Sequence, residues 1–422
     1  MSIYKFGADL ALSARLPRFG LTTREPVRVG LLASPTGDAA KPGIPGLNGC
    51  KLWAERVNTK GGLQIGDRRR LVEVIAFDDQ LDPGRAVLGV KHLVLEQEVK
   101  FILMRGGDTV SGIVDFLNRH KVLASTNSPS DLGPDRPYLI APCQCHPLYV
   151  AIGVDWLREN RPQLKTVSIC AQQDSVGLQS LATYRAAFKL SGIQIVKEVH
   201  YAADTHDVEG IVDAMLGPQP DIMCWNTSSE PLIHALSEAA YRKGFNGQIL
   251  SYAADNYQSL IARTSAEFME GTVFHFPEFD DPALGAGFIN FPQPAEFYAE
   301  YNRRFPGEWS PDSWVYCSVL EMWRRAVERI QTSDPVAVLS AMKFGGFSAN
   351  VFGDARWWGR EIFGMDHVLI GSWPVVEIRN KKAKIVEFRS VLDWCNIHGD
   401  ALVQEMRDLG QTWHQRSEDS SA

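Results

Sequence analysis

The stretch Val27-Arg28-Val29-Gly30-Leu31-Leu32 begins the pattern that decides the fold. It is a short, mostly apolar run of the kind that forms a buried strand. A loop rich in Gly and Pro follows it to Gly46, and apolar residues then recur at helical spacing to about Lys60. A strand followed by a helix is the unit from which parallel sheets are built.

The same unit repeats along the next part of the chain. Apolar runs predict strands at 71–77, 101–104 and 122–124, and Asp82-Pro83 supplies the N-cap and the first-turn proline of a helix. Another helix is predicted at about 109–119. Right-handed crossovers and a parallel sheet are expected for such an alternation.

The alternation starts again after the prolines at 134, 137, 142 and 147. The fold class is therefore α/β, with two similar Rossmann-like parallel-sheet lobes. In the second unit, a helix to about 160 precedes strands at 166–171, 193–199, 221–225 and 248–252 and helices at 177–190, 208–216 and 230–243. The remaining predictions are helices near 294–304 and 312–331, antiparallel strands at 368–376 and 377–388, and a peripheral helix with a frayed tail at 396–422.

Composition and charge exclude several classes of protein. The 422-residue chain has 45% hydrophobic and 22% charged residues, which is typical of globular domains. Its net charge is −7 and it has no extended Lys/Arg cluster, so the basic footprint of a nucleic-acid-binding protein is missing. No window of about 18 apolar residues predicts a membrane span, and the first residues lack the apolar stretch of a secretory signal.

The seven cysteines are scattered and lie mostly in apolar contexts. An odd number without regular spacing argues against a disulfide framework and predicts buried thiols. This usage favours a reducing compartment.

Signatures of catalysis and cofactor binding are absent or incomplete. The loop from Pro35 to Gly49 lacks the glycine spacing of a dinucleotide site, and the acidic pair Asp78-Asp79 comes too late. Cys143-Gln144-Cys145-His146 could ligate a soft metal, but no second pair matches it, which favours an ordinary loop. We expect no enzyme activity, no cofactor and no metal; an enzyme that uses the first lobe for a nucleotide is the third interpretation.

Small and polar residues gather where the predicted parallel strands end, which is where open sheets bind ligands. Arg105, beside Gly106-Gly107, can hold a carboxylate through charge-assisted hydrogen bonds, or it can pair with Asp108 at the surface. Helix capping is the alternative for the strand-end loops, and burial in the core is the alternative for Trp225. The candidate ligand-binding residues are Arg105, Gly106, Thr109, Thr126, Ser128, Asp174, Val176, Trp225, Ser229, Tyr252, Ala253 and Asp255.

Several stretches resemble the branched-chain amino-acid type of periplasmic solute-binding protein, the type I binding-protein fold of ABC transporters. The resemblance spans about residues 27–395. The stretches that carry it are Val29-Gly30-Leu31-Leu32 with Pro35-Thr36-Gly37, Gly46-Leu47-Asn48-Gly49 with the helix to Gly61-Gly62-Leu63, Phe77-Asp78-Asp79-Gln80, and the run from Val99 to Ser128.

The resemblance implies two lobes joined by a three-segment hinge, which close on a small molecule and dock on a membrane permease without performing chemistry. It implies an N-terminal extension at 1–26, lobe 1 at 27–142 and 276–345, lobe 2 at 143–275 and 346–395, and a C-terminal helix and tail at 396–422.

The family's site residues suggest a ligand class for this chain. By resemblance, the ligand carboxylate falls near Arg105, Thr126 and Ser128. The family's acceptors for the ligand amino group fall near Val176, Ser229 and Ala253, where this chain has lost them. Because an uncompensated buried ammonium is costly, a carboxylate without an amine is expected to fit better, unless Asp174 or Asp255 substitutes.

We therefore expect a solute-binding component of an ABC transporter that captures a small carboxylate-bearing ligand, an organic acid or an amino-acid-like compound. Its partners would be that ligand and a membrane permease, with no nucleic acid and no insertion into the membrane. The alternative is a cytoplasmic small-molecule sensor of the same fold that regulates a partner protein. The resemblance implies a periplasmic location, whereas the missing export signal in the given sequence favours the cytoplasm.

Overall fold

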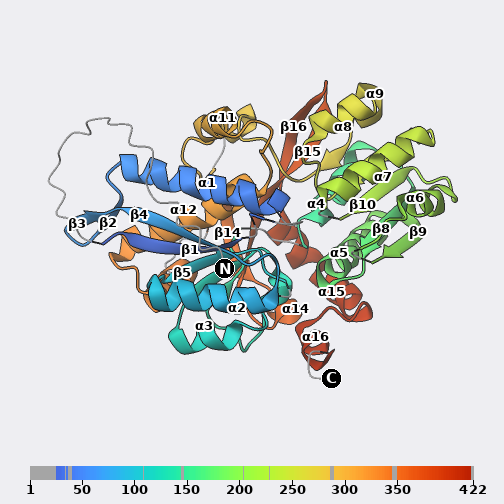
Figure 1. The fold of residues 1–422 in the computed structure, drawn as a ribbon. Helices are drawn as coiled ribbons and strands as arrows, with labels where there is room; N and C mark the ends of the chain where they lie inside the picture. The colour runs from blue at the N-terminus through green and yellow to red at the C-terminus, as the bar shows by residue number, and fades with distance from the viewer. Residues whose placement is uncertain are drawn as a thin grey trace.

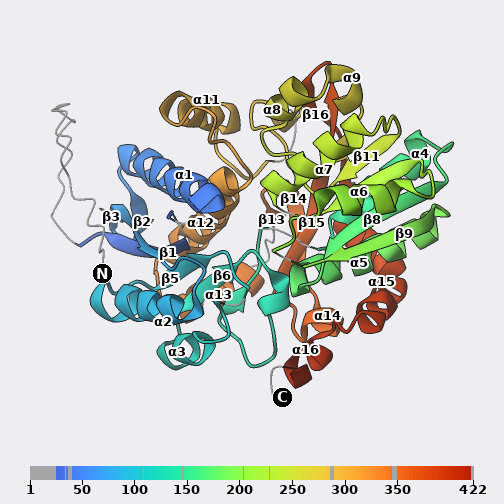
Figure 2. The same cartoon turned by 45° about the vertical axis from the view of Figure 1, so that its right-hand side comes forward.

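The computed structural model describes residues 25–33, 35–36, 40–107, 109–143, 147–202, 204–227, 229–285, 289–344 and 349–419. Most of the N-terminal extension and three residues of the Cys143–His146 cluster, 144–146, lie outside these ranges. Within them, no helix has both the length and the apolar character needed to cross a membrane. Two sheets organise the chain, each with helices around it (Figures 1 and 2).

The first sheet is wholly parallel, as the strand–helix alternation predicts. Its order is β4 (Val72–Asp78), β1 (Val27–Ala33), β5 (Phe101–Met104), β6 (Leu123–Thr126) and β7 (Leu139–Ile140). Figures 1 and 2 show helix α1 on one side of these strands and α2 and α3 on the other. The helices of this half are α1 (Ala40–Thr59), α2 (Pro83–Lys91), α3 (Val114–His120), α11 (Pro294–Arg304), α12 (Asp312–Ile330) and α13 (Pro335–Phe344).

Short elements complete this half. A π-helical turn (His92–Glu96) extends α2, a 3₁₀ turn (Pro129–Asp131) follows β6, and β2 (Leu63–Ile65) pairs with β3 (Arg68–Arg70) in a hairpin.

The second sheet has nine strands and combines parallel and antiparallel pairing. Its parallel part consists of β9 (Gln194–Tyr201), β8 (Thr166–Gln172), β10 (Ile222–Asn226), β11 (Gln248–Ser251) and β12 (Val273–Phe274). Its antiparallel part consists of β15 (Val368–Arg379), β16 (Lys382–Ser390), β14 (Gly353–Trp358) and β13 (Ala349–Asn350).

Helices cover both faces of the parallel part. Helices α4, α5 and α15 contact one another, and α6 contacts α7 as a second group. The helices of this half are α4 (Val150–Asn160), α5 (Ser175–Ser191), α6 (Val208–Leu216), α7 (Glu230–Arg242), α8 (Tyr257–Arg263), α9 (Ala266–Met269), α14 (Arg360–Phe363), α15 (Val391–Asp408) and α16 (Trp413–Asp419). The short helix α10 (Pro282–Gly285) lies in the connection from β12 to α11.

Strand β15 connects the two sheets. Its first residue, Val368, bridges Ala141 just beyond β7, while its far end pairs with β12. The bridge has two backbone hydrogen bonds, from the Ala141 N–H to His367 at 2.9 Å and from the Leu369 N–H to Ala141 at 3.0 Å.

An aromatic cluster fills the interior where the two halves meet. Trp373 of β15 stacks on Tyr149 with ring centroids 5.3 Å apart, and it contacts Phe352 edge-on at 4.9 Å and Trp314 of α12 at 6.2 Å. Such pairs hold elements of both halves together.

The structure corrects three element predictions. Helix α1 begins at Ala40 and not after Gly46, so Gly46 and Gly49 lie within the helix. They serve close packing on α12, because a Cβ at Gly49 would come within 2.0 Å of the Ser313 carbonyl oxygen. The first antiparallel strand continues to Arg379, and the second begins at Lys382.

The third correction concerns the C-terminal segment, which was expected to be a peripheral helix with a frayed tail. Helix α15 begins at Val391 and contacts α4 and α5. Leu402, Val403 and Met406 recur at helical spacing along it and are buried, so most of this segment belongs to the core.

Candidate functional site

The loop after β5 presents a guanidinium beside two glycines. Arg105 follows the strand directly and is partly exposed. Gly106 and Gly107 have φ of +94° and +82°, a region that glycine enters without strain. Thr109 is 4% exposed and donates its hydroxyl to the Gly106 carbonyl at 3.4 Å. Asp108, the alternative partner of Arg105, lies outside the described residues.

Helix α12 places an acidic residue, Asp312, within electrostatic range of Arg105. Burial raises the pKa of the Asp312 carboxyl above its usual value, and the positive charge of Arg105 acts against that rise. Tyr316, one turn further along α12, is buried. Burial and the charge of Asp312 raise the pKa of its phenol, and the charge of Arg105 lowers it. Its ring lies so close to α1 that a Cβ on Gly46 would come within 2.8 Å of it.

The second half of the molecule contributes two further acidic residues, Asp255 and Glu230, and Glu230 is the first residue of α7. Asp255 follows β11, and Nε2 of His234 contacts its backbone carbonyl at 2.8 Å. It keeps some contact with solvent, yet burial raises its pKa to about 8, helped by the negative charges of Asp312 and Glu230. We call Arg105, Glu230, Asp255 and Asp312 the interlobe charge cluster. It combines one cation with three acidic groups from both halves of the molecule.

The loop after β6 contains a carboxyl group of its own, that of Asp131. Thr126 is 2% exposed and donates its hydroxyl to Oδ2 of Asp131 at 2.5 Å. The backbone N–H of Gly107 donates to both carboxylate oxygens of Asp131, at 3.0 and 3.1 Å. Burial raises the pKa of Asp131 to about 7, although these hydrogen bonds and the charges of Arg136 and Arg416 oppose the rise. Thr126 therefore serves an internal carboxylate and does not point a free hydroxyl at a ligand.

Ser128 belongs to the same turn. Its backbone N–H donates to the hydroxyl oxygen of Thr126 at 2.9 Å, and its carbonyl accepts from the Asp131 N–H at 2.9 Å. The backbone of Ser128 thus shapes the turn that presents Asp131.

Three candidates of the second sheet lie at helix starts. Asp174 caps α5: its carboxylate accepts from the Gly177 N–H at 2.7 Å. Val176 lies in the first turn of the same helix and is partly exposed. Ser229 occupies the N-cap position of α7 without a capping hydrogen bond from its side chain. Of the two acidic substitutes for the lost amino-group acceptors, Asp174 is engaged in capping, and Asp255 is the one on which the charge of Asp312 acts.

The remaining candidates are mostly enclosed by the core. Trp225 is 0% exposed on β10, between β8 and β11, and its Nε1 has no hydrogen-bond partner among the described residues. Tyr252 is 7% exposed, and its ring lies 5.6 Å from that of Tyr149. Ala253 is 4% exposed. Trp225 is thus packed inside the second half, while Tyr252 and Ala253 are only slightly exposed to solvent.

Sequence reasoning did not single out Asp131, Glu230 or Asp312. Glu230 and Asp312 begin α7 and α12, and acidic residues at helix starts are common for dipole reasons alone. The local pattern therefore carried no signal of a site. Within the described ranges, no three His, Cys, Asp or Glu side chains come together as a metal site requires.

Comparison with known proteins decides the family. The model of a family described as periplasmic binding protein matches residues 26–383, which is most of the chain. The chain belongs to the periplasmic binding protein family. The family resemblance and the α/β fold predicted from the sequence are confirmed. A search of curated proteins finds no match to this binding protein.

Solved structures share the fold at low sequence identity. An ABC transporter substrate-binding protein of Sphaerobacter thermophilus is 17% identical with a TM-score of 0.68, covering 87% of this chain and 98% of that protein. A leucine-binding protein of Thermotoga maritima is 19% identical with a TM-score of 0.65, covering 86% and 99%. A solute-binding protein of Rhodopseudomonas palustris in complex with 4-hydroxybenzoate is 16% identical with a TM-score of 0.69, covering 88% and 99%.

Proposed function

We propose that this binding protein is the solute-binding component of an ABC transporter, which captures a small ligand between its two lobes and delivers it to a membrane permease. The proposed place of action is the periplasm, and the proposed role is capture and release without chemical turnover. The family and the titles of the solved neighbours support the role.

The interlobe charge cluster carries the proposal for the ligand class. Arg105 suits a ligand carboxylate. Asp255 and Asp312 have raised pKa values because burial disfavours their charged forms, and a nearby ligand cation would relieve this cost. A ligand with both a carboxylate and an ammonium matches the two signs of charge, so we propose an amino-acid-like compound.

An organic acid is the second candidate for the ligand. It is favoured by Arg105 together with the loss of the family's amino-group acceptors at Val176, Ser229 and Ala253. The neighbours of known ligand include both classes, because one is named for leucine and another was solved with 4-hydroxybenzoate.

A sensor of the same fold is the competing role, and it is favoured by free thiols because these suit a reducing compartment. The six described cysteines, at 50, 143, 170, 224, 317 and 395, are all free and buried. Ligand-dependent binding to purified permease supports the transporter role, and its absence for a ligand that closes the lobes contradicts it.

Hinge closure is the proposed mechanism, with lobe 1 at 27–142 and 276–345 and lobe 2 at 143–275 and 346–395. Helices α12 and α13 contact the first half through α1 and β6, although they come late in the chain, and this supports that division. A ligand that contacts groups of both lobes binds the closed form more tightly than the open form. This difference in affinity shifts the protein toward the closed form.

Matched ligand sets test the ligand class directly. Leucine, 4-methylpentanoate and 3-methylbutylamine share one apolar group and differ in their charges, and valine and phenylalanine give similar sets. We expect the amino acid of at least one set to raise the melting temperature more than its acid or its amine, because a ligand at about 100 times its Kd adds about 2.7 kcal/mol of stability. Greater stabilisation by the acid in every responding set overturns the amino-acid-like proposal.

A further inference from the structure

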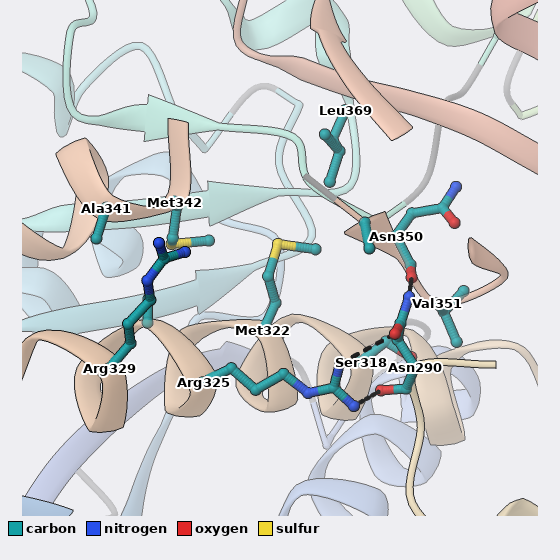
Figure 3. Close-up of a pocket in the computed structure, with 12 residues that line it drawn as sticks. Asn290, Ser318, Met322, Arg325, Arg329, Ala341, Met342, Asn350, Val351 and Leu369 are labelled. Atoms are coloured by element: carbon teal, nitrogen blue, oxygen red, sulfur yellow. Dashed lines mark hydrogen bonds between the residues drawn. The ribbon is translucent and has the colours of Figure 1, made fainter. Parts of the chain in front are cut away.

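A pocket that is partly open to solvent lies on another part of α12 (Figure 3). The interlobe charge cluster uses Asp312 at the start of this helix, whereas the pocket extends to Arg329 in its last turn. The nearest residue of α12 that lines the pocket, Ser318, is six residues beyond Asp312, which is about 9 Å along the helix at about 1.5 Å of rise per residue. None of the residues that line the pocket belongs to the interlobe charge cluster, so the pocket is separate from the proposed ligand site.

Apolar and soft side chains make most of the pocket's interior. Met322 of α12 and Met342 of α13 project into it, and both have the flexible thioether that adapts to apolar ligands (Figure 3). The other apolar lining residues are Ala326, Ala341, Ala349, Val351 and Leu369. These residues come from α12 and α13 and also from β13, the segment after it and β15, which join the two halves of the molecule.

Two guanidinium groups line the same pocket, and they differ in their partners. Arg325 donates to the side-chain oxygen of Asn290 and to its backbone carbonyl, each at 3.0 Å, and also contacts Glu321. Arg329 is exposed, and its guanidinium makes no hydrogen bond or ion pair with any of the described residues. Figure 3 shows it reaching toward Met342 at one end of the pocket, while Arg325 is held against Asn290. An uncommitted cation beside an apolar cavity is complementary to an amphipathic anion.

We propose that this pocket is a second ligand site, which binds a small organic anion with its apolar part between Met322 and Met342 and its carboxylate on Arg329. Such a ligand contacts α12 and α13 on one side and β13 and β15 on the other. The proposal does not depend on which ligand the interlobe charge cluster binds.

Methionine-methyl NMR of the full chain, titrated with hexanoate, tests the proposal. We expect saturable shifts of the Met322 and Met342 signals, assigned by Met→Leu variants. Met104, the last residue of β5 before Arg105, reports on the interlobe site in the same spectra. We expect Arg329→Gln to raise the apparent Kd of hexanoate about tenfold, which is the loss of one charge-assisted hydrogen bond of about 1.4 kcal/mol.

Two controls separate charge from shape. Arg303→Gln removes an exposed arginine of α11 outside the pocket and should leave the titration unchanged. Ala341→Leu fills the pocket at a partly exposed position, so the protein should fold while hexanoate no longer shifts either signal. Hexylammonium has the same chain with the opposite charge and should have no effect.

The outcomes distinguish this proposal from that for the interlobe site. In Arg105→Ala protein, the Met322 and Met342 titration should persist even if every response at Met104 disappears. Absence of shifts at Met322 and Met342, equal shifts with hexylammonium, an unchanged Kd in Arg329→Gln, or unchanged binding in Ala341→Leu would each overturn the second site.

Discussion

The hydroxyl of Thr126 donates to Oδ2 of Asp131 at 2.5 Å, and the backbone N–H of Gly107 donates to Oδ1 of the same carboxylate at 3.0 Å. Two strand ends of the first sheet thus bind a carboxyl group that the chain itself supplies. An external carboxylate would have to displace Asp131 to use these donors. Arg105, on the same loop as Gly107, is the group left to meet a ligand.

Replacing Thr126 with Val should destabilise the protein and leave ligand affinity nearly unchanged. The buried carboxylate loses one donor and the Ser128 N–H loses its acceptor, each loss costing about 1–3 kcal/mol of unfolding free energy. Thr126→Ser keeps the hydroxyl and is the control. Denaturant unfolding and calorimetry measure the two effects; normal stability with a large loss of affinity would instead place Thr126 on the ligand.

Gly106→Ala should be far more damaging than Gly107→Ala, although the two glycines are adjacent. A Cβ at Gly106 would come within 2.1 Å of both Asp131 Oδ2 and Thr126 Oγ1, whereas nothing lies within 4 Å of a Cβ at Gly107. Both variants bear the cost of a left-handed backbone, about 1–2 kcal/mol, and only Gly106→Ala adds overpacking of about 1–3 kcal/mol. Equal melting temperatures for the two variants would refute this packing of Asp131.

Arg105→Ala should weaken the ligand identified in the thermal-shift screen by about 30-fold or more. Removing one member of a buried charge pair typically costs about 2–5 kcal/mol. Folding should change little because the side chain is partly exposed in a loop. Calorimetry checks the affinity, with Arg105→Lys as the variant that retains the charge; unchanged affinity in Arg105→Ala would remove the carboxylate role.

The pH dependence of affinity should reveal the sign of the ligand charge near Asp255. Its pKa of about 8 means that the carboxyl is largely protonated at about pH 6.5 and ionised well above that value. An ammonium group prefers the ionised form, so the affinity of an amino-acid-like ligand should rise between about pH 6.5 and 8.5. A ligand with only a carboxylate should show the opposite slope.

Asp255→Asn is the control for this pH profile and should flatten it. Calorimetry at several pH values would measure the slope in both proteins. A steep slope that survives in Asp255→Asn would assign the titration to another group.

The raised pKa of Asp255 also predicts how the stability of the protein varies with pH. The folded state raises the pKa of Asp255, so it holds this proton more tightly than the unfolded chain does. The resulting stability is present below the unfolded pKa of about 4 and is lost as the pH rises through about 8. The melting temperature of Asp255→Asn should therefore gain on that of the wild type as the pH rises from about 6 to about 8 and should gain little more above that value, and parallel melting curves from pH 6 to pH 8 would contradict this.

Closure is a separate prediction. The screened ligand should lower the radius of gyration of the protein, because binding groups come from both lobes. X-ray scattering with and without saturating ligand measures this, with Arg105→Ala as the variant in which the decrease should need more ligand. An unchanged radius at saturation would exclude hinge closure.

The sequence by itself determined the repeating units and many of their boundaries. Strand β5, helix α6 and helix α11 have the predicted bounds of 101–104, 208–216 and 294–304. These elements are set by apolar periodicity and by local capping, which neighbouring residues in the chain encode. The family followed from the same local stretches.

Only the tertiary structure decided which side chains meet. Asp312 and Arg105 are far apart in sequence, and the charge of Arg105 acts on Asp312 because α12 packs on α1 in the first half. The charge of Asp312 also acts on Asp255 of the second half, because β15 holds the second sheet beside the first. The tertiary structure also encloses Trp225 completely, on a strand that lies between β8 and β11. Pairings of this kind depend on long-range packing, which leaves no periodic pattern in the sequence near any one of these residues.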